Sequence, residues 1–204
     1  ADICCFYEEN NKIWIGTQNG LYSYENGKIV EEKEINEQLP DIMIHGIQRD
    51  RQGKLWLGTF GKGLIVFSPE GKRIMRFDTS NGMESNAVNA LYIDSEGNLW
   101  AATRAGIVHI SDTSNPTLEI YNHKQGLIDE NVRSLTEDEK GNIWLGTNGG
   151  IAQWKKKEKR LQKQKEKEEE QEFEEEPISK KEKLKKSKDE KDDEASEETQ
   201  KKED

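Results

Sequence analysis

Four stretches of the chain repeat one pattern of apolar and polar positions, at residues 8–17, 50–59, 94–103 and 138–147. Each begins with an acidic residue and a polar turn, and continues as an aliphatic residue, a tryptophan, an apolar residue, a small residue and a threonine. The tryptophans lie at positions 14, 56, 100 and 144, so the repeat steps are 42, 44 and 44 residues. A repeat of this length is typical of the blades of a β-propeller.

Each repeat is expected to contain short antiparallel strands. In the third repeat we predict strands at residues 88–93, 99–103, 107–110 and 118–121. In the second repeat, Leu55 and Leu57 face one side of their strand, while Trp56 and Gly58 face the other. Both sides are apolar or small, which is expected of a sheet packed between two neighbouring sheets. The glycine that follows the tryptophan is expected to let the next blade approach closely.

The positions that recur in every repeat are interpreted as scaffold. An aspartate at the turn can cap backbone amides two residues further on, and the glycine after it supplies a positive φ. The first repeat has Asn11 where the others have glycine, and asparagine tolerates the left-handed region of φ/ψ space. The predicted scaffold residues are Trp14, Trp56, Trp100, Trp144, Asp50, Asp94, Asp138, Gly53, Gly97, Gly141, Thr17, Thr59, Thr103 and Thr147.

The pattern predicts an all-β fold, a partial β-propeller of about four blades that are each a four-stranded antiparallel sheet. The predicted blades span about residues 1–35, 36–79, 80–123 and 124–154, and the fourth stops at Trp154, where its outer strand should begin. Residues 155–204 carry 17 basic and 19 acidic side chains among 50. We predict that this segment is a disordered or partly helical charged tail, because it cannot bury enough apolar surface to fold.

Charge and reactive residues exclude several functions. The first 154 residues hold 14 basic and 22 acidic side chains, which disfavours nucleic-acid binding. Neither a signal peptide nor a stretch of transmembrane length is recognised in residues 1–204. The adjacent Cys4 and Cys5 predict neither a disulfide nor a zinc site. His45, His109 and His123 have no metal-site spacing. We therefore expect no cofactor, no metal and no enzyme activity.

A binding site is expected in the loops that join the second strand of each blade to the third. These loop residues differ between repeats, whereas the aspartates and tryptophans do not, as expected of a binding surface on a repeated scaffold. Phe60 and Arg104 are the best candidates for contacting a sugar or an acidic group. The predicted ligand-binding residues are Gln18, Asn19, Phe60, Lys62, Arg104 and Asn148.

The pattern D-x-x-G-N-L-W-x-G-T-x-x-G-L, over residues 1–154, resembles the two-component regulator propeller repeat. That resemblance implies a ligand-sensing module of a bacterial two-component type signalling protein, periplasmic or extracytoplasmic and responsive to carbohydrate. The implied partners are an oligosaccharide ligand, together with further propeller blades and signalling output domains that lie outside this chain; homo-oligomerisation stays open. The alternative is a protein-interaction scaffold that holds partners through the propeller face and the charged tail.

Overall fold

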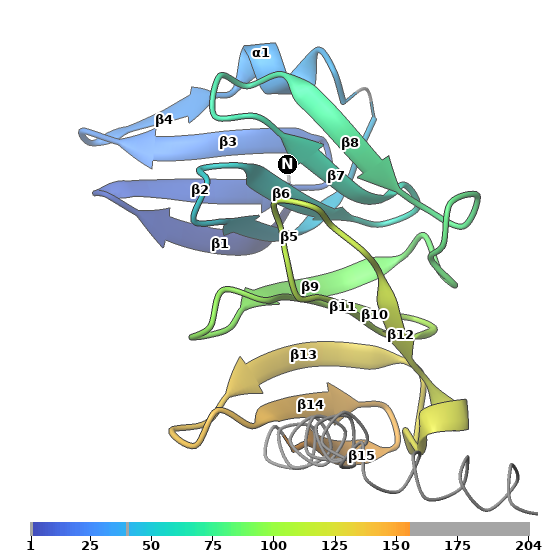
Figure 1. Cartoon of the computed structure of the whole chain (residues 1–204). Coiled ribbons are helices and arrows are strands. Elements are labelled where there is room, and N and C mark those ends of the chain that lie inside the picture. The colour runs from blue at the N-terminus through green and yellow to red at the C-terminus, as the bar shows by residue number, and fades with distance from the viewer. Residues whose placement is uncertain (1, 40, 156–204) are drawn as a thin grey trace, which may run out of the picture. The chain divides into compact units, whose positions relative to one another are not determined.

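The computed structural model describes residues 2–39 and 41–155, and every structural statement below refers to them (Figure 1). Its contacts divide the chain into two units, Ala1–Lys156 and Lys157–Asp204. The first unit holds all the strands described here. The tail predicted at residues 155–204 lies, except for Lys155, outside the described residues.

Fifteen strands form four antiparallel sheets, and each sheet follows the order of the chain. The first sheet contains β1 (Ile3–Glu9), β2 (Lys12–Thr17), β3 (Gly20–Glu25) and β4 (Lys28–Glu31). The second contains β5 (Ile44–Arg49), β6 (Leu55–Thr59), β7 (Gly63–Phe67) and β8 (Arg73–Phe77). The third contains β9 (Val88–Ile93), β10 (Leu99–Thr103), β11 (Gly106–Ile110) and β12 (Glu119–Tyr121). The fourth contains β13 (Val132–Glu137), β14 (Ile143–Thr147) and β15 (Gly150–Trp154).

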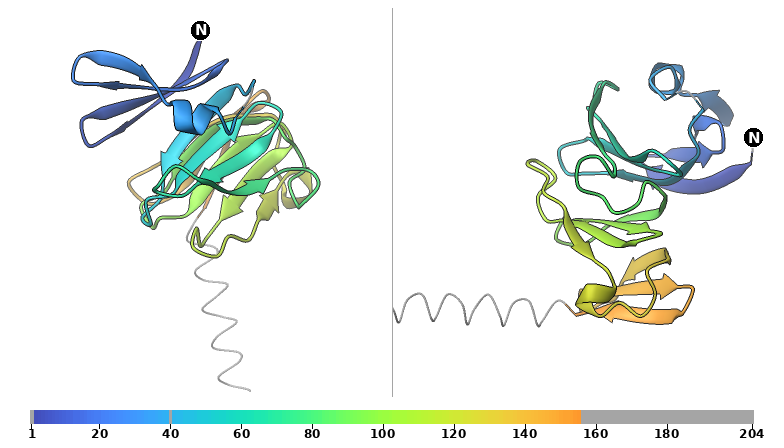
Figure 2. Two further views of the ribbon diagram at one scale, coloured as in Figure 1. Left: turned by 90° about the horizontal axis from the view of Figure 1, so that it is seen from above. Right: turned by 90° about the vertical axis from the view of Figure 1, so that its right-hand side faces the viewer.

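These sheets are the predicted blades, and they stack face to face in the order of the sequence (Figures 1 and 2). The first strand of each sheet contacts the first strand of the next, so that β1, β5, β9 and β13 are neighbours. The all-β fold and the propeller-like arrangement predicted from the repeat are therefore confirmed. In the part of the chain that the structure describes, the fourth blade has three strands.

Both faces of the second strand of a blade are buried, because each face packs against a different neighbouring blade. Leu55 and Leu57 lie in one cluster with Trp14 and Leu21 of the first blade. Trp56, from the opposite face of the same strand, lies in a second cluster whose other members include Val88, Leu91, Leu99 and Ala101 of the third blade. The alternation in the sequence thus assigns each side chain to one of two inter-blade cores.

The glycine two residues after the tryptophan is needed for close approach of the blades. A Cβ at Gly58 would lie 2.6 Å from Cγ1 of Val88, on the first strand of the next blade. A Cβ at Gly16 would lie 2.7 Å from the carbonyl oxygen of Ile44, again in the next blade. In the third blade Ala102 takes this position and is fully buried.

Two short helices lie in the connections between blades, and the sequence did not reveal them. Helix α1 (Lys33–Asn36) buries Ile35, and the side chain of Asn36 bonds the backbone N–H and C=O of Leu21 at 2.8 and 3.0 Å. A single 3₁₀ turn, η1 (His123–Gln125), begins with a capping box formed by Asn122 and Gln125. Both helices fix the path of the chain from the last strand of one blade to the first strand of the next.

Candidate functional site

The repeated aspartate organises the turn at one end of the second, third and fourth blades. Oδ1 of Asp50 accepts hydrogen bonds from the backbone N–H groups of Gln52 and Lys54, at 3.0 and 2.9 Å. Its Oδ2 accepts a bond from the indole Nε1 of Trp56, at 2.9 Å. Asp94 and Asp138 make the same set of bonds in the third and fourth blades. One carboxylate therefore caps the turn and also holds the tryptophan that packs against the next blade.

In the fourth blade these hydrogen bonds also change the acidity of the aspartate. Side-chain bonds from Asn142 and Trp144 lower the pKa of Asp138 from 3.8 to about 2. A carboxylate that accepts several hydrogen bonds is stabilised in its ionised form. This arrangement explains the aspartates as structural acceptors.

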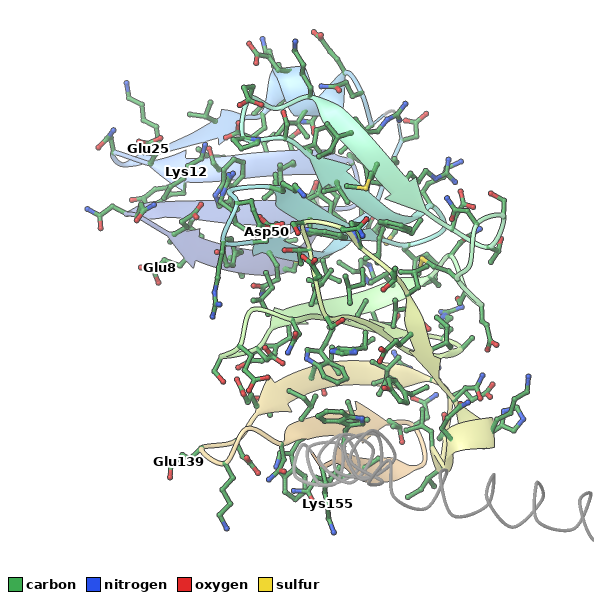
Figure 3. The ribbon with its side chains drawn as sticks, in the orientation of Figure 1. Glu8, Lys12, Glu25, Asp50, Glu139 and Lys155 are labelled. Atoms are coloured by element: carbon green, nitrogen blue, oxygen red, sulfur yellow. The ribbon has the colours of Figure 1, made fainter. Side chains whose placement is uncertain are left out.

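The first blade departs from this arrangement. Its turn is shorter: Glu9 pairs with Lys12, and the carboxylate of Glu9 accepts from Nε of Arg49 at 2.7 Å. Trp14 Nε1 is buried without a hydrogen-bond partner among the described residues. Nζ of Lys12 instead lies 3.9 Å from the centre of the Trp14 ring, and the same ammonium pairs with Glu32 at 2.7 Å. Figure 3 shows Glu8 near the end of β1 and Glu139 in the turn after β13, both at the turn end of their blades.

At the opposite end of each blade, the repeated threonine closes the loop to the third strand. Oγ1 of Thr59 donates to the carbonyl oxygen of Gly63 at 2.8 Å and accepts from the N–H of Lys62 at 3.1 Å. Thr17, Thr103 and Thr147 donate in the same way to Gly20, Gly106 and Gly150. The variable side chains of these loops are thus displayed from fixed backbones.

A β-bulge adds a second set of variable side chains at the same end. The pairing of β5 with β6 shifts between Ile44 and Gly46, which leaves His45 without a partner residue on β6. The same shift occurs in the other three first strands, and bulges of this kind redirect a side chain. The residues at the bulges are Cys4, His45, Asn89 and Arg133.

Loop and bulge residues meet at one cluster formed by His45, Phe60 and Arg104. The rings of His45 and Phe60 are 5.4 Å apart, and the guanidinium carbon of Arg104, from the third blade, lies 4.5 Å from the centre of the Phe60 ring. Burial lowers the pKa of His45, and the nearby positive charge of Arg104 lowers it further. Phe60 is 37% exposed, so one aromatic ring remains accessible beside a cation.

The other predicted binding residues make separate contacts within their own blades. Oδ1 of Asn148 accepts a bond from Nε of Arg133 at 3.0 Å, again joining a loop to a bulge. Gln18 binds Oδ2 of Asp2 at 2.9 Å, and the backbone N–H of Asn19 binds Thr17. Lys62 lines a separate pocket with Arg76.

The bulge residues were missed as site residues in the sequence. Each first strand begins with an aliphatic residue, and the residue directly after it differs between blades. This variable position is the signal that could have identified the bulge residues. The bulge itself depends on strand register, which the spacing of apolar residues does not define.

One cavity elsewhere in the unit is less suited to a ligand. A pocket of about 550 Å³ lies between the first two blades and is lined by residues that include Trp14, Arg49 and Phe67. Of its two cationic residues, Lys33 and Arg49, the second is already engaged, since Nε of Arg49 pairs with Glu9 at 2.7 Å. We therefore place the candidate site at the loop and bulge residues. No group of three or more His, Cys, Asp or Glu side chains that could hold a metal occurs within residues 2–39 and 41–155.

Four stacked antiparallel meanders, with their first strands adjacent, define a β-propeller repeat protein. The family model for the two component regulator propeller matches residues 38–61, 82–105 and 126–149. These segments are two component regulator propeller repeats, as the sequence motif indicated.

Solved structures give the same result. The extracellular domain of a hybrid two component system from B. thetaiotaomicron is 35% identical, with a TM-score of 0.69 over 74% of this chain and 21% of that one. The extracellular domain of a one component system from the same organism is 26% identical, with a TM-score of 0.57 and the same coverages. This chain therefore spans about a fifth of either domain.

Other similarities concern the fold alone. Virginiamycin B lyase from Staphylococcus aureus is 15% identical, with a TM-score of 0.57 over 75% of this chain and 55% of that one. A search of curated proteins gave no match. Within the described part of the chain, no helix has the length and apolarity required to cross a membrane.

Proposed function

We propose that residues 1–154 are part of a ligand-sensing propeller of a bacterial two-component type signalling protein, and that the ligand is a carbohydrate. Three features support a binding role: the repeats match a regulator propeller, two similar structures are extracellular domains of signalling systems, and the side chains at one end of the blades vary. On the same grounds the module is extracytoplasmic, in the periplasm, and its signalling output lies outside this chain. It binds a ligand rather than converting a substrate.

The observation that carries the proposal is the contact between Phe60 and Arg104. A partly exposed aromatic ring can stack on the apolar C–H face of a sugar, and a guanidinium donates hydrogen bonds in a fixed planar geometry. The two residues come from different blades, so a bound ligand would bridge the second and third blades. Such a bridge can transmit binding to the relative position of the blades, as a sensor requires.

The proposal is tested by calorimetric titration of the full chain with a panel of neutral oligosaccharides. For the sugar that binds, Phe60→Ala and Arg104→Ala should each weaken binding at least tenfold. Arg51→Ala is the matched control, because Arg51 is exposed at the opposite end of the blade and bonds only the backbone oxygen of Ser95. Equal affinity in Phe60→Ala, Arg104→Ala and the unmodified chain would contradict this assignment.

A further inference from the structure

A second, smaller pocket lies on the second blade, beside the loop that carries Phe60. Its volume is about 180 Å³, and it is lined by Gln38, Ile42, Lys62, Ile65, Arg73 and Arg76. Lys62 comes from the loop between β6 and β7, Arg73 and Arg76 from β8, and Gln38 and Ile42 from the connection that follows α1. Three of its six lining residues are cationic.

The cations are held in place mainly by backbone oxygens. Nε of Arg76 donates to the carbonyl oxygen of Lys62 at 3.1 Å, and Nη1 of Arg73 donates to the carbonyl oxygen of Gln38 at 3.2 Å. The side chain of Gln38 in turn accepts from the N–H of Arg73 at 2.8 Å and donates to the carbonyl oxygen of Gly71 at 2.8 Å. These bonds hold Arg73 through backbone and amide groups, and they hold Arg76 together with its ion pair to Asp78.

Within residues 2–39 and 41–155, a carboxylate pairs with one of the three cations of the pocket. Arg76 forms an ion pair with Asp78 at 2.9 Å. Among the described residues, neither Lys62 nor Arg73 lies within ion-pair distance of a carboxylate. In a repeat region with 22 acidic and 14 basic side chains, two unneutralised cations at one pocket are a local feature rather than a consequence of composition.

The remaining walls of the pocket are apolar. Ile42 and Ile65 are 6% and 1% exposed, so their side chains belong to the buried part of the blade. The volume corresponds to roughly six water molecules at ~30 Å³ each, which is room for an oxyanion and part of the group that carries it. Guanidinium and ammonium groups bind carboxylate and sulfate oxygens through charge-assisted hydrogen bonds.

We propose that this pocket binds the oxyanion group of an acidic ligand, a carboxylate or a sulfate, through Lys62, Arg73 and Arg76. The isoleucines contact the carbon skeleton next to that group. The site rests on its own contacts and does not require that a neutral sugar bind at Phe60. It extends the expected ligand contact of Lys62 to Arg73 and Arg76, which the sequence did not single out.

The test is calorimetric titration of the full chain at constant ionic strength, with sodium sulfate, sodium glucuronate and glucose as the three probes. We expect saturable binding of sulfate, glucuronate or both, and none of glucose at this pocket. Binding of sulfate identifies the oxyanion itself as sufficient, whereas binding of glucuronate alone shows that the sugar skeleton contributes. Absence of saturable binding of both anions would overturn the proposal.

Paired variants separate this pocket from general charge effects. Lys62→Gln with Arg73→Gln should weaken anion binding at least tenfold. Lys28→Gln with Lys140→Gln is the matched control, since it removes the same charge from exposed positions outside the pocket and should leave the affinity unchanged. An equal loss in both pairs would contradict a specific site.

Two single variants distinguish loss of the pocket from misfolding and from binding at the Phe60 cluster. Lys62→Gln alone changes an exposed side chain that makes no ion pair in the described part of the chain, so it should fold normally and bind anions at least threefold more weakly. Arg104→Ala should retain anion binding in full. If Arg104→Ala abolished it, the anion would bind at the Phe60 cluster and the pocket would be excluded, whereas failure of neutral sugars to bind concerns only the function proposed above.

Discussion

The indole Nε1 of Trp56 donates a hydrogen bond to Oδ2 of Asp50, six residues earlier, at 2.9 Å. Trp56 is completely buried against the third blade, while the other oxygen of Asp50 caps the turn before β6. One side-chain pair thus joins the local conformation of a blade to its packing against the next blade. The same pair recurs in the third and fourth blades.

Loss of this aspartate should destabilise the unit strongly where the tryptophan is buried. Asp50→Ala leaves a buried indole N–H unpaired and removes two turn bonds, so we expect the free energy of unfolding to fall by about 3 kcal/mol. Asp138→Ala is the matched variant, because Trp144 is 38% exposed and water can replace the lost acceptor. Its expected cost is about 1 kcal/mol. Urea denaturation measures both, and equal costs would contradict the role assigned to the buried indole.

The first blade lacks this hydrogen bond, which predicts a contrast between two tryptophans. Trp14 Nε1 has no acceptor among the described residues, so Trp14→Phe removes no hydrogen bond. Trp56→Phe does remove one, so it should lower the free energy of unfolding by about 1 kcal/mol more than Trp14→Phe, the usual value of a hydrogen bond formed on folding. Urea denaturation measures both losses, and equal losses would contradict the role assigned to the bond with Asp50.

The close approach at Gly58 predicts a third effect. Gly58→Ala places a methyl group 2.6 Å from Val88 Cγ1 and should cost about 1–3 kcal/mol, because a well-packed interface has no room for it. Gly146→Ala occupies the same position in the fourth blade, where the nearest atom is Oγ of Ser134, a side chain that can rotate away. Denaturant unfolding should therefore show a smaller loss for Gly146→Ala. A larger loss at Gly146 would argue against packing between blades as the reason for this glycine.

The fold was largely predictable because its determinants are local and repeated. The tryptophan spacing, the turn aspartates and the two-faced apolar strands indicated blades, and the strands of the third blade lie within one residue of their predicted bounds. Asn11 takes a φ of 64°, as expected for a residue in place of the turn glycine. Helix α1 was missed because four residues give no helical periodicity.

The candidate site was less predictable, for a physical reason. Phe60 and Arg104 were selected because their loop positions vary, but their mutual contact depends on how two blades pack. The role of His45 depends on a bulge, which arises from strand register rather than from residue type. The pocket of Lys62 and Arg73 brings together residues from three separate segments of the chain.

The packing of Arg104 near His45 can be tested by titration. The pKa of His45 is lowered by burial and by the positive charge of Arg104, so Arg104→Ala should raise the pKa of His45 towards its ordinary value. Proton NMR of the imidazole over pH 4–8 measures the change, in a range that brackets the unperturbed histidine pKa of about 6.5. Arg51→Ala should leave the titration unchanged. An unaltered pKa in Arg104→Ala would show that the two side chains do not interact.

The ligand is expected to bind at the loop and bulge end of the second and third blades. This placement is tested most directly by amide NMR shifts. They are recorded while the oligosaccharide identified as the ligand is titrated into the full chain. We predict that the amides of Phe60, Gly61 and Arg104 shift with one common saturation curve. Shifts confined to the opposite turns, at residues 50–54 and 94–98, would contradict it.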